Sequence, residues 1–345
     1  MITELPGISK SDIDRSERSQ WRYRKALPVD IQDPISLGEG LTPLLQRALD
    51  GAPVHYKVEW FNPTASFKDR GAAVMLSYLR QAGVPAILED SSGNGGSAMA
   101  AYGAAAGMGV TILTPETTQA AKTAQMRAFG ADVTLVPGPR EASEEAAILQ
   151  SESTFYASHN WQAFFLQGTK LLAYELWEDF GFSAPDNVVV PASGGSNIMG
   201  LFIGFSELKR AGAIAKMPRI FCAQPANCAP VHASFQAGAT GQVECEFAPT
   251  IAEGTAIKRP VRMVQILESL RGSGGGTVTA SEAEIEHSVR ELTAMGLYAE
   301  PTSALGSAGA RNLLRSEQIS PGDTTAVILT GSGLKAPQYM TELFQ

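Results

Sequence analysis

One lysine stands in a chemically unusual position. Lys68 lies in the segment Asn62-Pro-Thr-Ala-Ser-Phe-Lys-Asp-Arg-Gly71, where Ser66 and Asp69 have the spacing of a helix capping box, with Asp in place of the usual Glu. Lys68 would then fall in the first helical turn, where the positive end of the helix dipole disfavours a cation. The same field lowers the pKa of the amine and favours a Schiff-base nucleophile. A surface lysine without chemical function is the alternative for this motif alone.

Two glycine-rich loops are predicted to begin helices. The segments are Asp90-Ser-Ser-Gly-Asn-Gly-Gly-Ser97 and Pro191-Ala-Ser-Gly-Gly-Ser-Asn-Ile-Met-Gly200, and free backbone N–H groups at helix starts bind anions. The first matches neither the dinucleotide fingerprint nor the phosphate loop ending in Gly-Lys-Ser/Thr, so it suits a carboxylate, with Asn94 as a further donor or acceptor. The second contains no basic residue, so a phosphate there would be held by N–H groups and the helix dipole. For both, a tight turn that needs glycine only for packing is the alternative.

A fourth loop follows a predicted strand near the end of the sequence. It reads Leu329-Thr-Gly-Ser-Gly-Leu-Lys335, and ligands of open α/β sheets bind at the carboxyl ends of strands. A neutral hydroxyl from Thr330 or Ser332 could meet a ring nitrogen there, or the segment is only a turn.

The segments between these loops alternate between helical and strand patterns. Strands are predicted at 86–88, 110–113, 133–136, 188–190, 219–223 and 325–329, and helices at 71–82, 96–106, 118–129, 168–179, 198–211 and 280–295. The strands are short and apolar on both faces, which favours a buried parallel sheet and an α/β fold. Residues 1–40 are interpreted as a polar arm, and 272–276 as a flexible link.

The composition excludes several classes of protein. A length of 345 residues favours two domains. The net charge of −8 gives no electrostatic reason to expect nucleic acid or an anionic membrane as a partner. No apolar run predicts a membrane span, and the first 20 residues lack the apolar core of a signal peptide. Cys222, Cys228 and Cys245 lack the spacing of a zinc site. We therefore expect no metal and a cytoplasmic location.

Taken together and in this order, the loops resemble those of the fold type II pyridoxal-phosphate enzymes, and most closely the threonine synthases. Ser36-Leu-Gly-Glu-Gly-Leu-Thr-Pro-Leu44 and Glu300-Pro-Thr-Ser-Ala304 add to the resemblance, which extends from about Trp21. It implies two open, twisted α/β domains with the cofactor in the cleft between them, and a homodimer. The large cofactor-binding domain would comprise residues 1–80 and 166–345, and an inserted substrate-carboxylate domain residues 81–165.

The resemblance also implies a role for each motif residue. Lys68 would form the Schiff base with pyridoxal 5′-phosphate and then shuttle protons. Asn94 would hydrogen-bond the phenolic oxygen of the cofactor, and Thr330 its ring nitrogen. The remaining cofactor-binding residues would be Ser193, Gly194, Gly195, Ser196 and Asn197. The substrate-binding residues would be Ser66, Ser92, Gly95 and Gly96.

Some positions depart from the threonine synthase pattern. Ser332 replaces the histidine of the usual Thr-Gly-His-Gly, and the stretch 160–167 contains no arginine for a substrate phosphate. Lys258, Arg259 and Arg262 could supply positive charge, or form a solvated basic face. The sequence therefore predicts a lyase of the threonine synthase type acting on a small amino acid. An ammonia-lyase of the serine/threonine type, a β-replacement synthase and a cofactor-binding paralogue without turnover remain alternatives.

Overall fold

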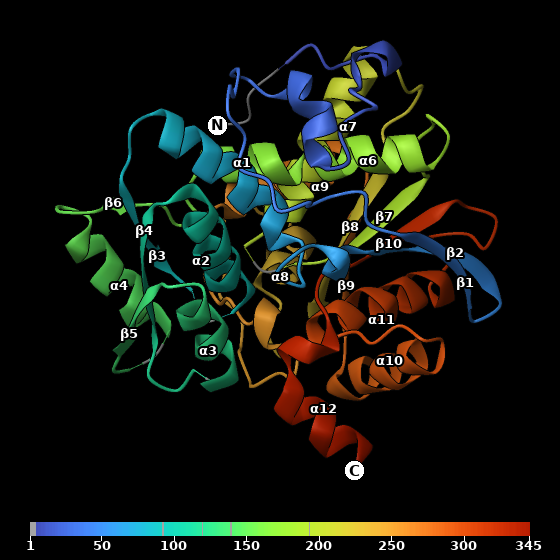
Figure 1. The fold of residues 1–345 in the computed structure, drawn as a ribbon. Coiled ribbons are helices and arrows are strands. Elements are labelled where there is room, and N and C mark those ends of the chain that lie inside the picture. Colours follow the sequence, from blue (N-terminus) through green and yellow to red (C-terminus); the bar gives the residue numbers. More distant parts are fainter. Residues whose placement is uncertain (1–4, 92, 119, 139, 193) are drawn as a thin grey trace.

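The computed structural model describes residues 5–345 except residues 92, 119, 139 and 193. Two of the predicted site residues, Ser92 and Ser193, therefore lie outside the described residues. Two β-sheets form the framework, and both lie among helices (Figure 1). This arrangement confirms the predicted α/β class.

The larger sheet has six strands, and its strand order mixes early and late parts of the chain. The order is β1 (Leu44–Leu49), β2 (Ala52–Val58), β10 (Thr325–Leu329), β7 (Asn187–Pro191), β8 (Arg219–Pro225) and β9 (Gly276–Ala280). Only the β1–β2 pair is antiparallel; the other pairs of this sheet are parallel. The predicted strands at 188–190, 219–223 and 325–329 lie in this sheet, whereas β1, β2 and β9 were not predicted.

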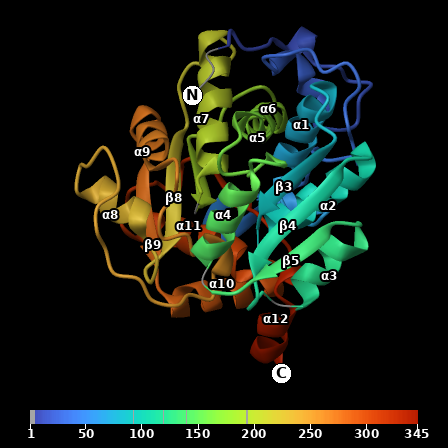
Figure 2. The ribbon, with the colours of Figure 1, turned by 90° about the vertical axis from the view of Figure 1, so that its left-hand side faces the viewer.

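The smaller sheet has four parallel strands taken from one stretch of the chain. The order is β5 (Asp132–Val136), β4 (Gly109–Pro115), β3 (Ala86–Asp90) and β6 (Phe155–Tyr156). Figure 2 shows β3, β4 and β5 of this sheet apart from β8 and β9 of the larger sheet. The domain boundaries at residues 80 and 166 stay a prediction, since the division into sheets does not fix where one domain ends.

Helices cover both faces of each sheet. The α-helices are α1 (Lys68–Gln81), α2 (Asn94–Ala106), α3 (Ala120–Ala128), α4 (Arg140–Gln150), α5 (Ala163–Thr169), α6 (Leu171–Asp179), α7 (Ser196–Arg210), α8 (Pro230–Gln236), α9 (Met263–Gly272), α10 (Glu282–Ala294), α11 (Pro301–Arg315) and α12 (Pro337–Phe344). Short 3₁₀ helices are η1 (Lys10–Asp12), η2 (Gln20–Ala26), η3 (Glu59–Phe61), η4 (Glu253–Thr255) and η5 (Gly333–Lys335).

Alternating residues of the larger sheet enter two cores. Val188, Val190 and Ile328 pack in the core that contains α7 and α9, whereas Val189 and Val327 pack in the core of α10 and α11. Side chains of successive strand residues point to opposite faces, so a strand buried on both sides must be apolar throughout. This is why the strands lack an alternating polar pattern.

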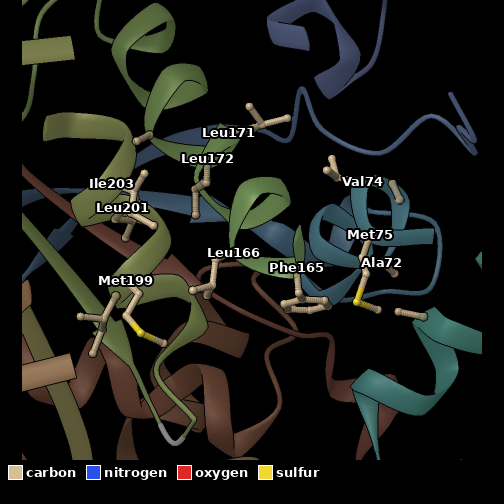
Figure 3. Close-up of a cluster of buried hydrophobic side chains, with 14 of the residues drawn as sticks. Ala72, Val74, Met75, Phe165, Leu166, Leu171, Leu172, Met199, Leu201 and Ile203 are labelled. Carbon is tan, nitrogen blue, oxygen red and sulfur yellow. The ribbon is translucent and has the colours of Figure 1, made fainter. Parts of the chain in front are cut away.

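The core next to α1 also holds α5, α6 and α7. Figure 3 shows Phe165 of α5 beside Ala72 and Met75 of α1. A Cβ placed on Gly71 would lie 2.4 Å from the Phe165 ring, so a glycine is needed for this approach. The predicted helix at 168–179 is divided at Lys170 into α5 and α6.

The N-terminal segment is not only a polar arm. Trp21 is 1% exposed and Tyr23 is fully buried, and both belong to the core of α1 and α6. Trp21 Nε1 donates a hydrogen bond to the carbonyl of Ile35 at 3.1 Å. The aromatic residues scattered among charges were the signal that this segment packs on the domain.

Candidate active site

The four loops predicted to carry chemistry follow the carboxyl ends of parallel strands. Lys68 comes after β2 and η3, the asparagine loop after β3, the glycine-rich loop after β7, and Thr330 directly after β10. Because β2, β10 and β7 are adjacent and parallel, the segments after them lie at one edge of the sheet. One cavity is lined by Lys68, the residues 194–197 and Thr330.

The segment before Lys68 is held by the last loop. Ser66 and Gly331 form an isolated antiparallel bridge. Phe67 N donates to the carbonyl of Thr330 at 3.0 Å, and Ser332 N donates to the carbonyl of Ala65 at 3.2 Å. This contact fixes the first turn of α1 beside Thr330.

Lys68 lies in the first turn of α1, as the sequence predicted, and is its first residue, but the predicted capping box is wrong. The N-cap residue is Phe67, which already has helical backbone angles and forms no side-chain cap. The Asp69 carboxylate instead accepts hydrogen bonds from Thr64, including one from Thr64 N at 2.6 Å. Ser66 Oγ is buried and has no partner among the described residues.

The Lys68 amine has aromatic rather than ionic neighbours. Its Nζ lies 4.9 Å from the centroid of the Phe67 ring and 5.5 Å from that of Phe165. Within the described part of the chain, the amine forms no hydrogen bond or ion pair. Burial lowers the pKa of Lys68 to about 8, although the negative charge of Glu89 opposes this shift. A larger share of the amine is therefore neutral and nucleophilic near neutral pH.

The residues 194–197, which follow β7, also line this cavity. α7 begins at Ser196, and Gly195 is its N-cap with φ +75°. An L-residue rarely adopts this φ, and a Cβ on Gly195 would also lie 2.4 Å from Ile266. Both amide atoms of the Asn197 side chain are buried without a partner among the described residues. The cavity wall therefore presents unpaired polar atoms at the positive end of a 15-residue helix.

Thr330 is positioned by a residue that the sequence analysis did not single out. The Ser303 hydroxyl lies 3.1 Å from Thr330 Oγ1, accepts a hydrogen bond from Gly331 N at 2.6 Å and donates to the Gly331 carbonyl at 2.8 Å. Ser303 belongs to the stretch Glu300–Ala304, whose resemblance to the family was the available signal. Thr330 is 2% exposed and carries no charge.

The asparagine loop lies against a second, adjoining pocket. Asn94 begins α2 and lines this pocket together with Glu300, Thr302 and Lys335. Asn94 Nδ2 donates to Glu300 Oε1 at 3.0 Å. Burial raises the pKa of Glu300 to about 6, while Lys335 and Asn94 oppose the shift.

The two pockets share lining residues that the sequence analysis did not propose as site residues. Gly254 and Thr302 line both of them, and Thr255 lines the cavity of Lys68.

Gly95 and Gly96 are buried in the first turn of α2. A Cβ on Gly95 would lie 2.8 Å from both His159 Cε1 and Ser91 Oγ. The predicted substrate loop is therefore packed closely against His159.

The basic residues near residue 260 divide into two groups. Arg262 donates to the carbonyls of Asn160, at 2.9 Å, and Trp161, so its guanidinium is occupied by backbone. Lys258 and Arg259 are exposed and line a separate pocket that also contains Arg140 and Gly194. Among the described residues, no group of His, Cys, Asp and Glu could hold a metal ion. No helix in the described residues is long and apolar enough to cross a membrane.

Known proteins resemble this chain in sequence and in fold. The model of the family described as "Pyridoxal-phosphate dependent enzyme" matches residues 35–331. Two threonine synthases are each 32% identical to the chain. The protein from Methanosarcina acetivorans matches over 94% of this chain and 82% of its own length, and that from Methanocaldococcus jannaschii over 96% and 84%. A solved structure of the processed form of threonine deaminase isoform 2 from Solanum lycopersicum superposes with a TM-score of 0.77. The two sequences are 20% identical. The superposition covers 100% of this chain and 91% of the deaminase chain.

Proposed function

Because the chain belongs to the family of pyridoxal-phosphate dependent enzymes, with threonine synthases among its relatives, we propose that it converts an activated homoserine to threonine by γ-elimination and addition of water. The chain is a pyridoxal-phosphate-dependent lyase of the threonine synthase type. The substrate is the part of this statement that we propose. The proposal includes a cytoplasmic homodimer.

The residues of the Lys68 cavity fit the cofactor. Pyridoxal phosphate supplies an aldehyde that reacts with amines and a ring that withdraws electrons from a bound amino acid. A phosphate suits the cradle at the start of α7, where Asn197 has unpaired amide atoms and the backbone is glycine-rich. We propose that Lys68 binds the aldehyde carbon and that Gly194, Gly195, Ser196 and Asn197 hold the phosphate.

Different residues would then transfer protons and bind the cofactor and the substrate. Lys68 Nζ, whose pKa lies at about 8, accepts the proton from Cα and returns it later. Thr330 would be the neutral partner of the ring nitrogen, and a hydroxyl there would leave this nitrogen largely unprotonated, which would favour elimination over transamination. The backbone N–H groups of Gly95 and Gly96 bind the substrate carboxylate at the start of α2. Asn94 is the proposed partner of the phenolic oxygen.

One observation carries the proposal: a single cavity brings together Lys68, the start of α7 and Thr330, which are far apart in sequence. To test it, the loaded enzyme is mixed separately with O-phosphohomoserine, threonine, serine and O-acetylserine. We expect phosphate release and new threonine from O-phosphohomoserine. Keto acid from threonine or serine, without phosphate release from the first compound, would contradict the proposal. No reaction with any of them would favour a paralogue without turnover.

A second function is favoured by a specific observation. The stretch 160–167 contains no arginine, and Arg262, which contacts this stretch, uses its guanidinium for backbone carbonyls. A phosphate-ester substrate would lack a bidentate arginine there. An ammonia-lyase acting on a β-hydroxy amino acid needs no such partner. The similarity to a threonine deaminase structure supports the fold of this alternative and not its substrate.

A further inference from the structure

Glu300 precedes α11 and binds a residue of another helix instead of capping its own. It is the N-cap residue of α11, a position from which a side-chain oxygen commonly accepts a backbone N–H of the first turn, but its carboxylate forms no such bond. Glu300 Oε1 instead accepts a hydrogen bond from Asn94 Nδ2 at 3.0 Å, although the two residues are 206 positions apart. Glu300 is only 7% exposed. A carboxylate buried to this extent needs a partner, and Asn94 is one.

This pair lies directly on the loop that carries Thr330. A Cβ on Gly331 would overlap Glu300 Oε1 and would lie 3.1 Å from Asn94 Nδ2. The backbone N–H of Glu300 also donates to the Gly331 carbonyl at 3.3 Å. The residue after Thr330 must therefore lack a side chain, because the pair occupies that space. The amide nitrogen of Asn94 thus faces the loop whose Thr330 lines the Lys68 cavity.

The carboxylate determines which end of the Asn94 amide faces this loop. An ionised carboxylate accepts hydrogen bonds and donates none, so only the NH2 end of the amide can pair with it. The NH2 group has two hydrogens, and Glu300 uses one. The Asn94 side chain forms no other hydrogen bond with the described residues, so a second N–H remains for a ligand. In a reversed amide, Oδ1 would stand at this place and would repel an anionic oxygen.

The charges around Glu300 decide whether it is ionised at the pH of an experiment. Burial raises the pKa of Glu300 to about 6, the charges of Lys335 and Lys122 and the hydrogen bond from Asn94 oppose this shift, and the charge of Glu253 adds to it. Lys122 itself is paired with Glu253 at 2.5 Å. At about pH 8, which is about two units above this pKa, nearly all of the carboxyl groups are ionised. The acceptor form that holds Asn94 therefore prevails there.

We propose that Glu300 is a positioning residue for pyridoxal phosphate, and that it turns the amide of Asn94 so that an N–H, and not Oδ1, is offered to the phenolic oxygen of the cofactor. The N–H stabilises negative charge on this oxygen. Glu300 therefore acts through Asn94 and not by a contact of its own. The inference rests on the proposed function only for the role of Asn94.

A double-mutant cycle on the full-length protein tests the inference. Binding of pyridoxal phosphate is measured by equilibrium dialysis at about pH 8 for Glu300→Gln, Asn94→Ala and the double variant. Gln has the shape of Glu but can also donate, so it no longer holds the amide of Asn94 in one orientation. Asn94→Ala should weaken binding by roughly tenfold and Glu300→Gln by roughly threefold. The double variant should bind within about twofold of Asn94→Ala, because Glu300 acts only through the amide that is already missing.

The absorption spectrum of the bound cofactor gives a second readout, which a loss of packing alone would not change. The conjugated ring of the cofactor absorbs at different wavelengths when its phenolic oxygen is ionised and when it is neutral. In Glu300→Gln, intensity should move from the band of the ionised form to that of the neutral form, because the N–H is offered less often.

Glu282→Gln is the matched control, since Glu282 is another carboxylate of the pocket that Asn94 and Glu300 line. Its Oε2 accepts a hydrogen bond from Ile251 N at 2.7 Å and none from Asn94. This variant should keep the affinity within about twofold and leave the spectrum unchanged. An effect of Glu282→Gln as large as that of Glu300→Gln would show that only the charge of the pocket matters, and would overturn the inference.

The cycle separates a failure of this inference from a failure of the proposed function. If Asn94→Ala changes neither affinity nor spectrum, the proposed role of Asn94 is wrong and this inference falls with it. If Asn94→Ala weakens binding but Glu300→Gln has no effect, or if the two losses multiply in the double variant, the inference alone is overturned. Because no substrate is present, the result does not depend on which amino acid the enzyme converts.

A second variant replaces Glu300→Gln if that protein does not fold. Gly331→Ala keeps the carboxylate but displaces it from Asn94, because the added Cβ would overlap Glu300 Oε1. Gly331 does not have a positive φ, so its backbone accepts alanine. Its loss of affinity should likewise be absent when Asn94 is already alanine, and a loss that persists in that background would contradict the inference.

Discussion

Lys68 and Arg70 are two cations in the first turn of α1, and their surroundings differ completely. Arg70 donates to both carboxylates of Glu59 and Glu175, with distances of 2.6 to 2.9 Å, and all three side chains are fully buried. Although burial alone would lower it, these two carboxylates raise the pKa of Arg70 well above its ordinary value. The Lys68 amine has no such partner among the described residues. A buried charge that is fully paired holds the fold together, whereas one left unpaired is available for chemistry.

The strongest test of this contrast removes the Lys68 amine. In Lys68→Ala we expect the visible absorbance of the covalently bound cofactor to disappear and turnover to fall by at least about 100-fold. Borohydride trapping followed by peptide mass mapping should locate the cofactor on Lys68 in the unchanged enzyme. Lys209→Ala, on the exposed last turn of α7, is the control and should keep both signals. An unchanged spectrum in Lys68→Ala would show that another residue binds the cofactor.

The converse test removes the paired cation. Arg70→Met should lower the free energy of unfolding by about 3–5 kcal/mol, because the buried Glu59 would lose Arg70 and the buried Glu175 would keep Lys57 as its cationic partner but lose Arg70. Urea unfolding of the cofactor-free protein measures this. Lys68→Met, two residues earlier in the same turn, should change the unfolding free energy by less than about 1 kcal/mol, since no described partner is lost. Equal losses in both variants would contradict the distinction between the two cations.

The pH dependence of chemical labelling measures directly how burial affects the unpaired Lys68 amine. In the cofactor-free protein, acetylation of Lys68 should have its midpoint near pH 8, because burial lowers the pKa of the amine to about 8. In the urea-unfolded protein the midpoint should return to about 10.4. Between these two values the unfolded chain binds more protons than the folded one, so this group makes the folded state more stable as pH rises. Mass spectrometry of the Lys68 peptide gives the midpoint, and a folded-state value above about 10 would refute the effect of burial.

A smaller effect, on the affinity for the cofactor, is expected from the unpaired side chain of Asn197 in the cavity wall. Asn197→Ala should lower the affinity for pyridoxal phosphate by roughly tenfold, or ~1.4 kcal/mol, while changing the stability of the cofactor-free protein little. The reason is that both amide atoms of Asn197 lack partners within the described structure. Asn62→Ala is the matched comparison, since Asn62 donates to the Glu59 carbonyl and accepts from Gly40 N. That variant should cost about 1–3 kcal/mol of stability. Equilibrium dialysis and urea unfolding separate the two effects.

The sequence predicted those parts of the site that depend on local pattern. The first turn of α1 contains Lys68, and the strand at 325–329 agrees residue for residue with β10. The carboxyl ends of parallel strands bring their loops together, so a correct α/β prediction already places Thr330 near the glycine-rich loop.

The parts that depend on distant partners were not predicted. Glu89 and His159 are 70 residues apart, and Asn94 and Glu300 are 206 apart, so nothing local indicates either contact. The capping box failed for a related reason, since the Asp69 carboxylate accepts its hydrogen bonds from Thr64 and none from Ser66. A capping motif shows which hydrogen bond a side chain can form. The tertiary contacts of the folded chain determine which hydrogen bond does form.

The position of β10 between β2 and β7 bears on how the protein is made. β10 pairs with a strand that ends at residue 58 and with one that starts at residue 187. A ribosome therefore releases both neighbours long before the strand that joins them. Until residues 325–329 have been synthesised, β2 and β7 each expose an edge that another chain could occupy. The larger sheet, and with it the cavity that Thr330 lines, is therefore complete only after this strand has been translated.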